Sequence, residues 1–382
     1  MNNISPKLIK YSSVLTSAVG IYYYKYKIYD FIGTNILNKL EPELAHNIVK
    51  TMLSNKIYFK YPEFKSDILN TYHLDLNFKN PVGLSAGFDK NGDMYQGLKN
   101  FGFGFVELGS VLKNPQPGNK PPRIFKNIEN NSIVNRLGLN SLGLEYFKKK
   151  ISQRDSDQII GINIGKNNNS KNYLNDYTKI LDEVHEYSDY LVINISCPNT
   201  QDYQKYNEIS NIHNIIKIVT SKNYNKPIFL KLSPNFNDYI LQNIIKLSIQ
   251  NNIDGLIISN TLPTSNGGLS GKPINEITTD MIKKVYKLSN GKLMIIGSGG
   301  VFSGKDAYQK IKSGASLIQI YTSFIYSGPK VVYDINKELE DLLVKDGYTN
   351  ISQAIGSDVE LNFSYQEYLN NLYNYYYDYF FN

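Results

Sequence analysis

Two apolar runs, "IIGINIG" (159–165) and "YLVINIS" (190–196), decide the fold class of this chain. Each run has the length and the content of β-branched residues that are typical of a buried strand. The stretch between them (166–189) is long enough to form a helix. A strand, a helix and a second strand in this order favour a parallel sheet.

Six further runs of the same kind extend the pattern along the chain. They are "PVGLSAG" (81–87), "GFVELGS" (104–110), "PIFLKLS" (227–233), "DGLIISN" (254–260), "LMIIGSGG" (293–300) and "ASLIQIYT" (315–322). Eight strand–helix units in about 250 residues are typical of a (β/α)8 TIM barrel, an α/β fold, which we predict for residues 71–356. A doubly wound sheet is the alternative, but no GxGxxG loop follows the first run.

Composition narrows the class of protein further. With 382 residues the chain fits one large barrel with extensions, or two modest domains. Its single cysteine excludes an intramolecular disulfide and indicates a reducing or redox-indifferent compartment. The four histidines are scattered, which argues against a zinc site. A net charge of +7 suits an anionic ligand or membrane, whereas the lack of a dense Lys/Arg block argues against nucleic acid.

The N-terminal segment (1–28) is basic, with Lys7, Lys10, Lys25 and Lys27, and contains no acidic residue. This composition predicts a mitochondrial targeting segment or a short membrane anchor. The apolar stretch "VLTSAVGIYYY" (14–24) is shorter than a full membrane span requires. A disordered, lysine-rich tail is the alternative interpretation.

Residues 29–70 form a predicted helical cap. Apolar residues recur there at helical spacing, and Pro42 suits the first turn of a second helix, so we expect two short helices. Such a cap either packs on its own domain or dips into a membrane surface. We predict no function for the Tyr/Asn-rich C-terminal tail (357–382).

Polar residues collect near the ends of the predicted strands, where the active sites of barrel enzymes lie. Strand side chains alternate in direction, so Asn163, Asn194 and Lys231 are expected to point to the barrel centre. A lysine is rarely buried without a partner. A solvent-facing Lys231 would need a sheet edge, and a closed barrel has none.

The last two runs predict a phosphate site. "GSGGV" (297–301) ends the seventh strand and "YTS" (321–323) ends the eighth. Glycines allow backbone N–H groups to approach an anion closely, and barrels often bind phosphate after these two strands. A phosphorylated cofactor is therefore expected. A fixed cation such as Lys231 beside a flavin would stabilise its reduced anion.

Cys197, in "NISCPNT" (194–200), follows the fourth strand of the series. A free thiol has a pKa near ~8.5 and reaches the thiolate easily. On a loop over the barrel mouth it would act as the base that removes a carbon-bound proton. The alternative is a small buried hydrophobic residue.

The chain resembles the dihydroorotate dehydrogenases, the flavin enzymes of pyrimidine synthesis. The segments that carry the resemblance are "NPVGLSAGFDKNGD" (80–93), "GFGFVELGSV" (102–111), "PQPGNKPPRIF" (115–125), "VNRLGLNS" (134–141), "GINIGKN" (161–167), "NISCPNT", "LKLSP" (230–234), "SNT" (259–261), "GGLSGKP" (267–273), "IGSGGV" (296–301) and "QIYT" (319–322). These segments follow the order of the family motifs, and the resemblance as a whole covers roughly residues 30 to 356. Long N-terminal helices before the barrel are typical of the membrane-associated, quinone-reducing class 2 branch.

The resemblance implies oxidation of dihydroorotate to orotate in de novo UMP biosynthesis, with FMN as cofactor and ubiquinone as acceptor at the mitochondrial inner membrane. Cys197 would take the C5 proton while hydride leaves C6 for flavin N5, with Lys90 and Lys231 as further catalytic residues. The implied FMN contacts are Ala86, Gly87, Phe88, Asp89, Lys90, Ser110, Asn135, Asn163, Asn194, Lys231, Ser259, Gly271, Gly299, Gly300, Tyr321 and Thr322. The implied pyrimidine contacts are Lys90, Asn135, Arg136, Leu137, Gly138, Leu139, Asn194, Asn199, Asn260 and Thr261. The implied quinone tunnel contains His46, Lys126 and Tyr321.

Three positions depart from the class 2 pattern. Cys197 stands where class 2 members usually have serine and the soluble class 1 branch has cysteine. Lys126 stands where arginine is usual, and the stretch between Thr261 and Gly267 is short. Two alternatives stay open. One is a soluble class 1-like dehydrogenase that uses fumarate or NAD, and the other is a non-enzymatic protein that retains a barrel and binds a membrane surface or nucleic acid.

Overall fold

A computed structural model describes residues 36–58, 60–154, 157–196 and 209–361. Eight parallel strands close into a barrel in the order β10-β13-β14-β3-β4-β7-β8-β9. Their bounds are β3 (Val82–Leu84), β4 (Phe105–Val111), β7 (Ile159–Ile164), β8 (Tyr190–Asn194), β9 (Ile228–Lys231), β10 (Gly255–Ile258), β13 (Met294–Ser298) and β14 (Leu317–Ile320). Each overlaps one predicted run. The (β/α)8 prediction is therefore confirmed, and the doubly wound alternative is wrong.

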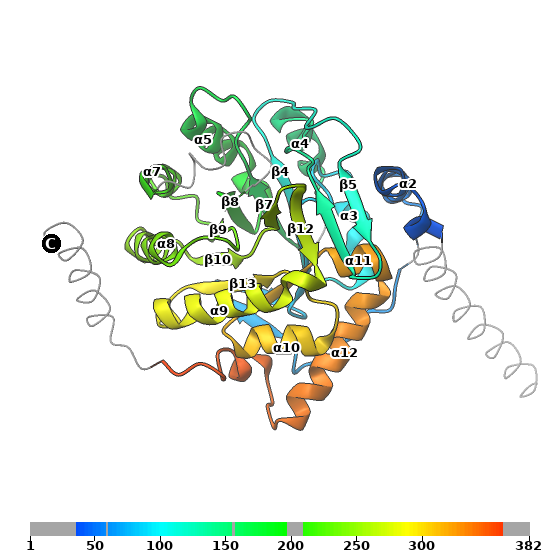
Figure 1. Ribbon diagram of the computed structural model, residues 1–382, viewed down its shortest axis with the longest axis vertical. Coiled ribbons are helices and arrows are strands. Elements are labelled where there is room, and N and C mark those ends of the chain that lie inside the picture. Colours follow the sequence, from blue (N-terminus) through cyan, green and yellow to red (C-terminus); the bar gives the residue numbers. More distant parts are fainter. Residues whose placement is uncertain (1–35, 59, 155–156, 197–208, 362–382) are drawn as a thin grey trace, which may run out of the picture.

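Helices surround the barrel (Figure 1). They are α3 (Tyr95–Leu98), α4 (Leu144–Ile151), α5 (Tyr173–Val184), α7 (Ile209–Val219), α8 (Asp238–Gln250), α9 (Asn275–Ser289), α10 (Gly304–Lys312), α11 (Thr322–Ser327) and α12 (Lys330–Lys345), with short 3-10 turns η3 (Lys99–Phe101), η4 (His185–Tyr187), η5 (Lys272–Ile274) and η6 (Ile351–Ala354). Side chains cap several N-termini: Asn172 accepts from the third backbone N–H of α5, Asn237 does so for α8, and Ser303 for α10. These caps use the polar residues that favour helix starts.

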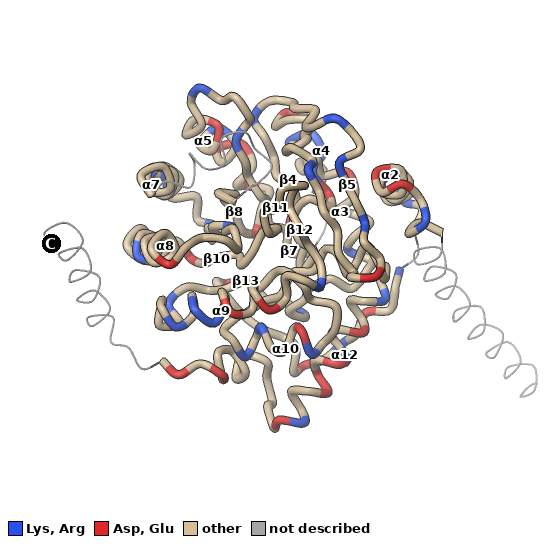
Figure 2. Tube along the Cα trace, in the orientation of Figure 1, with Lys and Arg blue, Asp and Glu red and all other residues tan. Residues whose placement is uncertain are grey.

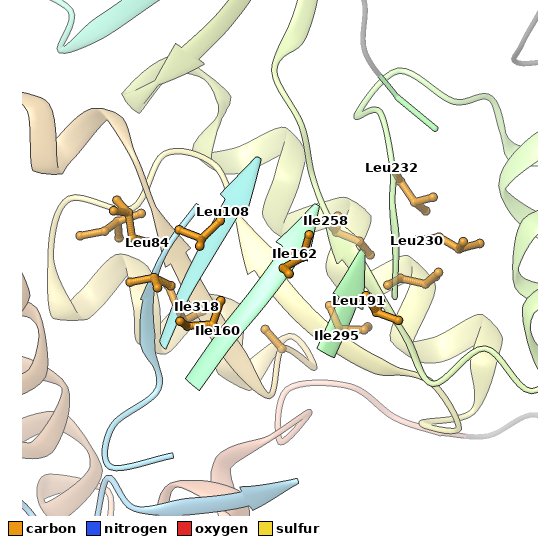
Figure 3. Close-up of a cluster of buried hydrophobic side chains, with 14 of the residues drawn as sticks. Leu84, Leu108, Ile160, Ile162, Leu191, Leu230, Leu232, Ile258, Ile295 and Ile318 are labelled. Atoms are coloured by element: carbon orange, nitrogen blue, oxygen red, sulfur yellow. The ribbon is translucent and has the colours of Figure 1, made fainter. Parts of the chain in front are cut away.

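The core has two layers because strand side chains alternate. One set of strand residues faces the helices, and Figure 3 shows part of it, including Leu108, Ile162 and Leu191. The other set faces the barrel interior, where Phe105, Tyr190 and Phe229 form a separate apolar cluster. Phe78 packs edge-on against Phe105, with ring centroids 5.6 Å apart. The bottom of the barrel is thus filled with aromatic rings.

Each of these three barrel aromatics is paired in register with a glycine on the neighbouring strand. The pairs are Gly83 with Phe105, Gly161 with Tyr190, and Gly255 with Phe229. A Cβ atom on Gly161 would lie 2.1 Å from Tyr190 Cζ, which no real contact allows. These glycines are therefore required by space: they leave room for a ring that crosses the interior.

Two smaller sheets lie outside the closed barrel. Strands β1 (Thr71–His73) and β2 (Leu76–Phe78) form an antiparallel pair. A four-stranded sheet has the order β11-β12-β6-β5, with β5 (Ile124–Asn127), β6 (Ser132–Asn135), β11 (Leu262–Thr264) and β12 (Gly267–Gly271). The short stretch after Thr261 is therefore a β-hairpin, which joins a distant part of the chain through the pairing of Gly268 with Asn135.

The cap consists of the turn η2 (Leu37–Lys39) and helix α2 (Pro42–Ser54) in the described residues. Pro42 lies in the first turn of α2, as predicted, and the Glu41 side chain accepts from Leu44 N at 2.8 Å. The predicted leader (1–28) and most of the tail (357–382) lie outside the described residues. Among the helices that are described, none is both long and apolar enough to cross a membrane. Basic and acidic positions both occur on the outer helices (Figure 2).

Candidate active site

A cleft opens at the carboxyl ends of the barrel strands. It encloses about 1070 Å³, including the space that is open to solvent. Residues from the strand ends and from β6 and β12 line it: Ser85, Ala86, Gly87, Lys90, Ser110, Asn135, Leu137, Gly138, Leu139, Asn140, Asn163, Asn194, Lys231, Ser259, Asn260, Thr261, Gly271, Gly299, Gly300, Gln319, Tyr321, Thr322 and Ser323. The predicted inward side chains Asn163, Asn194 and Lys231 are thus brought together.

Lys231 is buried beneath this cleft and has an acidic partner. Its Nζ lies 3.1 Å from Glu107 Oε1 and donates to Ser85 Oγ at 3.0 Å. An ammonium has three hydrogens, so one remains for a ligand in the cleft. Glu107 also accepts from Asn163 Nδ2 at 2.7 Å and from the Gln319 amide. One buried carboxylate therefore orients a cation and two amides.

Ser110 connects the amides on the other side of the cleft. Its Oγ donates to Asn163 Oδ1 at 2.5 Å and accepts from Asn194 Nδ2 at 3.0 Å. The register of β4 against β7 shifts between Leu108 and Val111. Strict alternation would place Glu107 and Ser110, three residues apart, on opposite faces of the strand. The bulge re-aims the residues that follow it, so both side chains face inward. Gly109 is required there, since a Cβ would lie 2.3 Å from the Asn163 carbonyl oxygen.

Asn260 holds the chain that leads into the loop after β8. Its Nδ2 donates to the carbonyl oxygen of Ser196 at 3.3 Å, and its Oδ1 accepts from Thr261 N at 2.8 Å. The Ser196 backbone N–H also donates to Asn194 Oδ1, at 3.1 Å. The amide groups of Asn194 and Asn260 are therefore fixed from both sides before any ligand binds.

The opposite end of the cleft is a glycine turn that suits a phosphate. Gly299 (φ 108°) and Gly300 (φ 74°) follow β13 in conformations that favour glycine. A Cβ on Gly300 would lie 2.5 Å from Asn275 Cα. Two buried atoms of lining residues, Ser323 Oγ and Asn140 Oδ1, have no hydrogen-bond partner among the described residues. Buried polar atoms need partners, so the residues present fit a phosphorylated, polar-edged cofactor.

A second cavity lies between α2 and the barrel and encloses about 2450 Å³, including open space. Its walls are largely apolar, with Leu53, Phe88 and Phe324 among the lining residues. Lys90, Asn135, Leu137, Asn140 and Tyr321 line both this cavity and the cleft. These shared residues form a common wall between the two spaces.

Lys90 and Tyr321, in the shared wall, are both perturbed by burial. Lys90 Nζ donates to the Gly87 carbonyl oxygen at 2.9 Å. Burial, followed by the positive charge of Arg123, lowers the pKa of Lys90 to about 8. Burial raises the pKa of Tyr321 to about 12. The wall therefore carries a neutral phenol beside an ammonium that titrates near physiological pH.

His46 projects from α2 into the second cavity. Its ring meets Phe88 edge-on, with centroids 5.3 Å apart. Burial, with smaller contributions from the charges of Lys90 and Lys50, lowers the pKa of His46 to about 3. The imidazole is therefore neutral at physiological pH. Burial also lowers the pKa of Lys126, on the facing β5.

Two ion pairs fix α2 against the barrel. Arg123 Nη2 lies 2.8 Å from Glu43 Oε1, and its Nε donates to the same oxygen at 2.9 Å. Lys50 Nζ lies 2.6 Å from Asp93 Oδ2. The cavity under α2 is thus lined by apolar side chains and by residues of both ion pairs.

The family model described as dihydroorotate dehydrogenase matches residues 68–343, which include the whole barrel. This chain belongs to the dihydroorotate dehydrogenase family. The family that the sequence motifs predicted is therefore confirmed.

Several curated relatives are named dihydroorotate dehydrogenase (quinone). The protein of Sulfurimonas denitrificans is 40% identical over 344 residues, which cover 84% of this chain and 97% of that protein. The mitochondrial proteins of Oryza sativa and Mus musculus are each 35% identical, with 86% and 91% of this chain covered, and 80% and 93% of the relative.

Two solved dihydroorotate dehydrogenase structures from Eimeria tenella share the fold. The complex with ferulenol superposes with a TM-score of 0.78 at 33% identity, covering 83% of this chain and 95% of that chain. The ligand-free type has a TM-score of 0.77 at 34% identity, covering 84% and 99%.

Most residues that the dihydroorotate dehydrogenase resemblance implied lie in the two spaces. His46, Lys126 and Tyr321 all line the second cavity. Phe88 and Asp89 lie on that side too, where Asp89 accepts from the backbone N–H groups of Asp93 and Met94.

Of the implied residues that the structure describes, Arg136 lines neither space. Arg136 turns away, because its guanidinium donates to the Pro122 carbonyl oxygen and stacks 5.2 Å over the ring of Phe125. Cys197 and Asn199 lie outside the described residues, so their roles stay predictions.

The sequence did not lead us to predict three residues of the site: Glu107, Gln319 and Arg123. Glu107 is the single charged residue in "GFVELGS" and Gln319 the single amide in "LIQI", and each faces inward. A search for polar residues within apolar runs, as well as at their ends, would have found both. Arg123 carried no such signal, because its partner Glu43 is distant in sequence.

Proposed function

We propose that this chain is an FMN-dependent dihydroorotate dehydrogenase of the mitochondrial inner membrane in which Cys197 is the base. It is an oxidoreductase that oxidises dihydroorotate to orotate and passes the electrons to a quinone. The observation that carries the proposal is the polar cleft that shares Lys90 and Tyr321 with a separate apolar cavity. One space suits a charged pyrimidine and the other an apolar quinone.

The cofactor contacts follow from the cleft. Gly299, Gly300 and Thr322 are suited to hold the phosphate. Lys231 has a hydrogen to donate to the flavin ring, and Glu107 keeps it in place. FMN, when bound, supplies a two-electron acceptor for the hydride that leaves the substrate.

The substrate contacts come from the opposite wall. Asn194, Asn260 and Thr261 offer amide and hydroxyl groups that can orient a pyrimidine, and Lys90 offers a cation for its carboxylate. Cys197 would take the C5 proton as a thiolate and pass it to solvent.

The acceptor contacts come from the α2 cavity. Neutral His46, Lys126 and Tyr321 would border the quinone head group there. The cap would rest on the membrane, from which the apolar chain of the quinone enters. Mitochondrial targeting is supported by the basic N-terminal composition.

The purified full chain should be yellow, and anaerobic dihydroorotate should bleach it. The bleached protein is then offered a soluble ubiquinone analogue, fumarate, NAD and oxygen in parallel. We expect rapid recolouring with the quinone. A flavin that stays oxidised with dihydroorotate would overturn the substrate assignment, while recolouring with fumarate or NAD alone would favour the class 1-like alternative.

Cys197 is tested with Cys197→Ala and Cys197→Ser. Cys197→Ala should keep FMN and lose most of the bleaching rate, whereas Cys197→Ser should retain activity with a pH profile displaced upward, because a hydroxyl is a weaker acid than a thiol. Unchanged bleaching in Cys197→Ala would remove this residue from the mechanism.

A further inference from the structure

Lys310 is a buried lysine outside both cavities. It lies on α10 with no exposed surface. Its Nζ donates to the Asn275 carbonyl oxygen at 3.1 Å, to Thr278 Oγ1 at 2.7 Å and to Thr279 Oγ1 at 2.8 Å. All three acceptors belong to the first turns of α9, which lies beside α10 (Figure 1). The three ammonium hydrogens are thus satisfied by neutral oxygens.

The charge of Lys310 has no close counterion. Within the described ranges, no carboxylate forms an ion pair with Lys310. The negative charges of Asp306 and Asp280 act on the ammonium without an ion pair and raise its pKa against the larger effect of burial. The helix dipoles act on it in opposite directions: its acceptors lie at the positive, N-terminal end of α9, whereas Lys310 itself lies in the last turn of α10, where a cation is favoured. A buried charge is costly unless it is compensated by an opposite charge. A counterion for Lys310 is therefore still to be found.

The acceptors of Lys310 connect directly to the glycine turn of the cleft. Thr278 Oγ1 lies 3.1 Å from the Gly299 carbonyl oxygen, and Asn275 Nδ2 donates to the Gly300 carbonyl oxygen at 2.7 Å. Because Lys310 already donates to Thr278, the Thr278 hydroxyl must use its own hydrogen toward a carbonyl. The carbonyl oxygens of Ile274 and Asn275, at 2.8 and 2.9 Å, share that hydrogen with Gly299. A single hydroxyl thus separates the ammonium from the turn.

We propose that Lys310 is a positioning residue for the cofactor phosphate: it fixes the first turn of α9 against Gly299 and Gly300 and supplies positive charge behind that turn. The inference rests on the proposed function, since it takes FMN as the cofactor. A phosphate dianion on the turn is the missing counterion. Burial lowers the pKa of Lys310 to about 7, so such an anion would also favour its charged form.

The test compares FMN with riboflavin, which has the same ring system and no phosphate. Apoprotein of the full chain is titrated with each ligand, and flavin fluorescence gives the Kd. Lys310→Met should raise the Kd for FMN at least tenfold and change the Kd for riboflavin by less than twofold. The matched control is Lys312→Met, on the same helix, where a more exposed lysine pairs with Asp358 at 2.9 Å; it should change neither Kd.

Equal weakening of both ligands, or an unchanged FMN affinity, would overturn the proposal. If Lys310→Met does not fold, Thr278→Val removes the connecting hydroxyl and keeps the lysine. This variant should also raise the Kd for FMN and leave the Kd for riboflavin unchanged. A Kd for FMN equal to that of the wild type would overturn the proposal. A wild-type chain that binds no FMN would instead overturn the proposed function, so the two failures are distinct.

Discussion

Glu107 places a negative charge directly beside Lys231, beneath the proposed flavin site. The side chains of Lys231 and Glu107 are 5% and 0% exposed, so solvent screens their charges weakly. In the proposed site, the pair would present the flavin with a cation whose field is partly cancelled by the carboxylate. Glu107 would therefore set how strongly Lys231 stabilises an anionic reduced ring.

Glu107→Gln should raise the reduction potential of the bound flavin, because it removes a negative charge and leaves Lys231 in place. We expect at least a tenfold change in the two-electron equilibrium constant, about 30 mV, in an anaerobic dye-linked titration. Gln319→Met is the control, since it removes a hydrogen bond to Glu107 and keeps both charges. A potential that falls or stays constant in Glu107→Gln would contradict this role.

His46 should make the protein less stable in acid. Its pKa is about 3 in the folded chain, against an ordinary value of 6.5. Between these values the unfolded chain binds more protons, so the free energy of unfolding falls as the pH falls below 6.5. His46→Gln should reduce the stability lost between pH 7 and pH 5 by about 1–2 kcal/mol, measured by urea unfolding.

The control for this experiment is His213→Gln, at an exposed position of α7. The same loss of stability in His46→Gln and in the wild type would show that His46 does not carry the acid sensitivity.

Residues that carry a local signal were found from the sequence, and those defined by distant partners were not. Alternation along single strands was enough to predict that Asn163, Asn194 and Lys231 face inward. The acidic partner of Lys231 lies on another strand, 124 residues away. Its pairing depends on barrel closure, which no local pattern specifies.

At the level of elements, α2 is held to the barrel by charge pairs that can be removed without touching the cleft. Glu43→Gln combined with Lys50→Met removes one partner of each pair. Asp93 keeps Lys150 as a partner at 3.4 Å, and no barrel strand is changed, so the fold should persist while α2 loosens. We expect the KM for a ubiquinone analogue to rise severalfold and the rate of bleaching by dihydroorotate to stay constant.

The control is Lys222→Met, which removes an exposed ion pair with Asp182, away from α2. A slower bleaching step in the Glu43/Lys50 double variant would show that α2 also supports the cleft.

The barrel strands were predictable because each is an apolar run, but the four-stranded sheet was not. β5 and β6 show no continuous apolar run, and β12 is rich in glycine. The sheet exists because β12 pairs with β6, which lies more than a hundred residues earlier in the chain. Long-range pairing of this kind has no signature within a short window.

Three pairs of a glycine with an aromatic ring help to fill the barrel interior. Gly161→Ala should destabilise the fold by about 1–3 kcal/mol, since its methyl group would overlap the Tyr190 ring. Tyr190→Leu should destabilise it too, by leaving a cavity. The double variant should lose less than the sum of the two, with a coupling of about 0.5–3 kcal/mol in denaturant unfolding. Additive losses would mean that the pair does not act together.

If the proposed function holds, the wall that contains Lys90 and Tyr321 allows the two halves of turnover to be blocked separately. A molecule bound under α2 would stop the protein after electrons have arrived, and the sample would stay bleached. One bound in the cleft would stop it before they arrive, and the sample would stay yellow. The colour of a stalled preparation would therefore report which of the two cavities an inhibitor occupies.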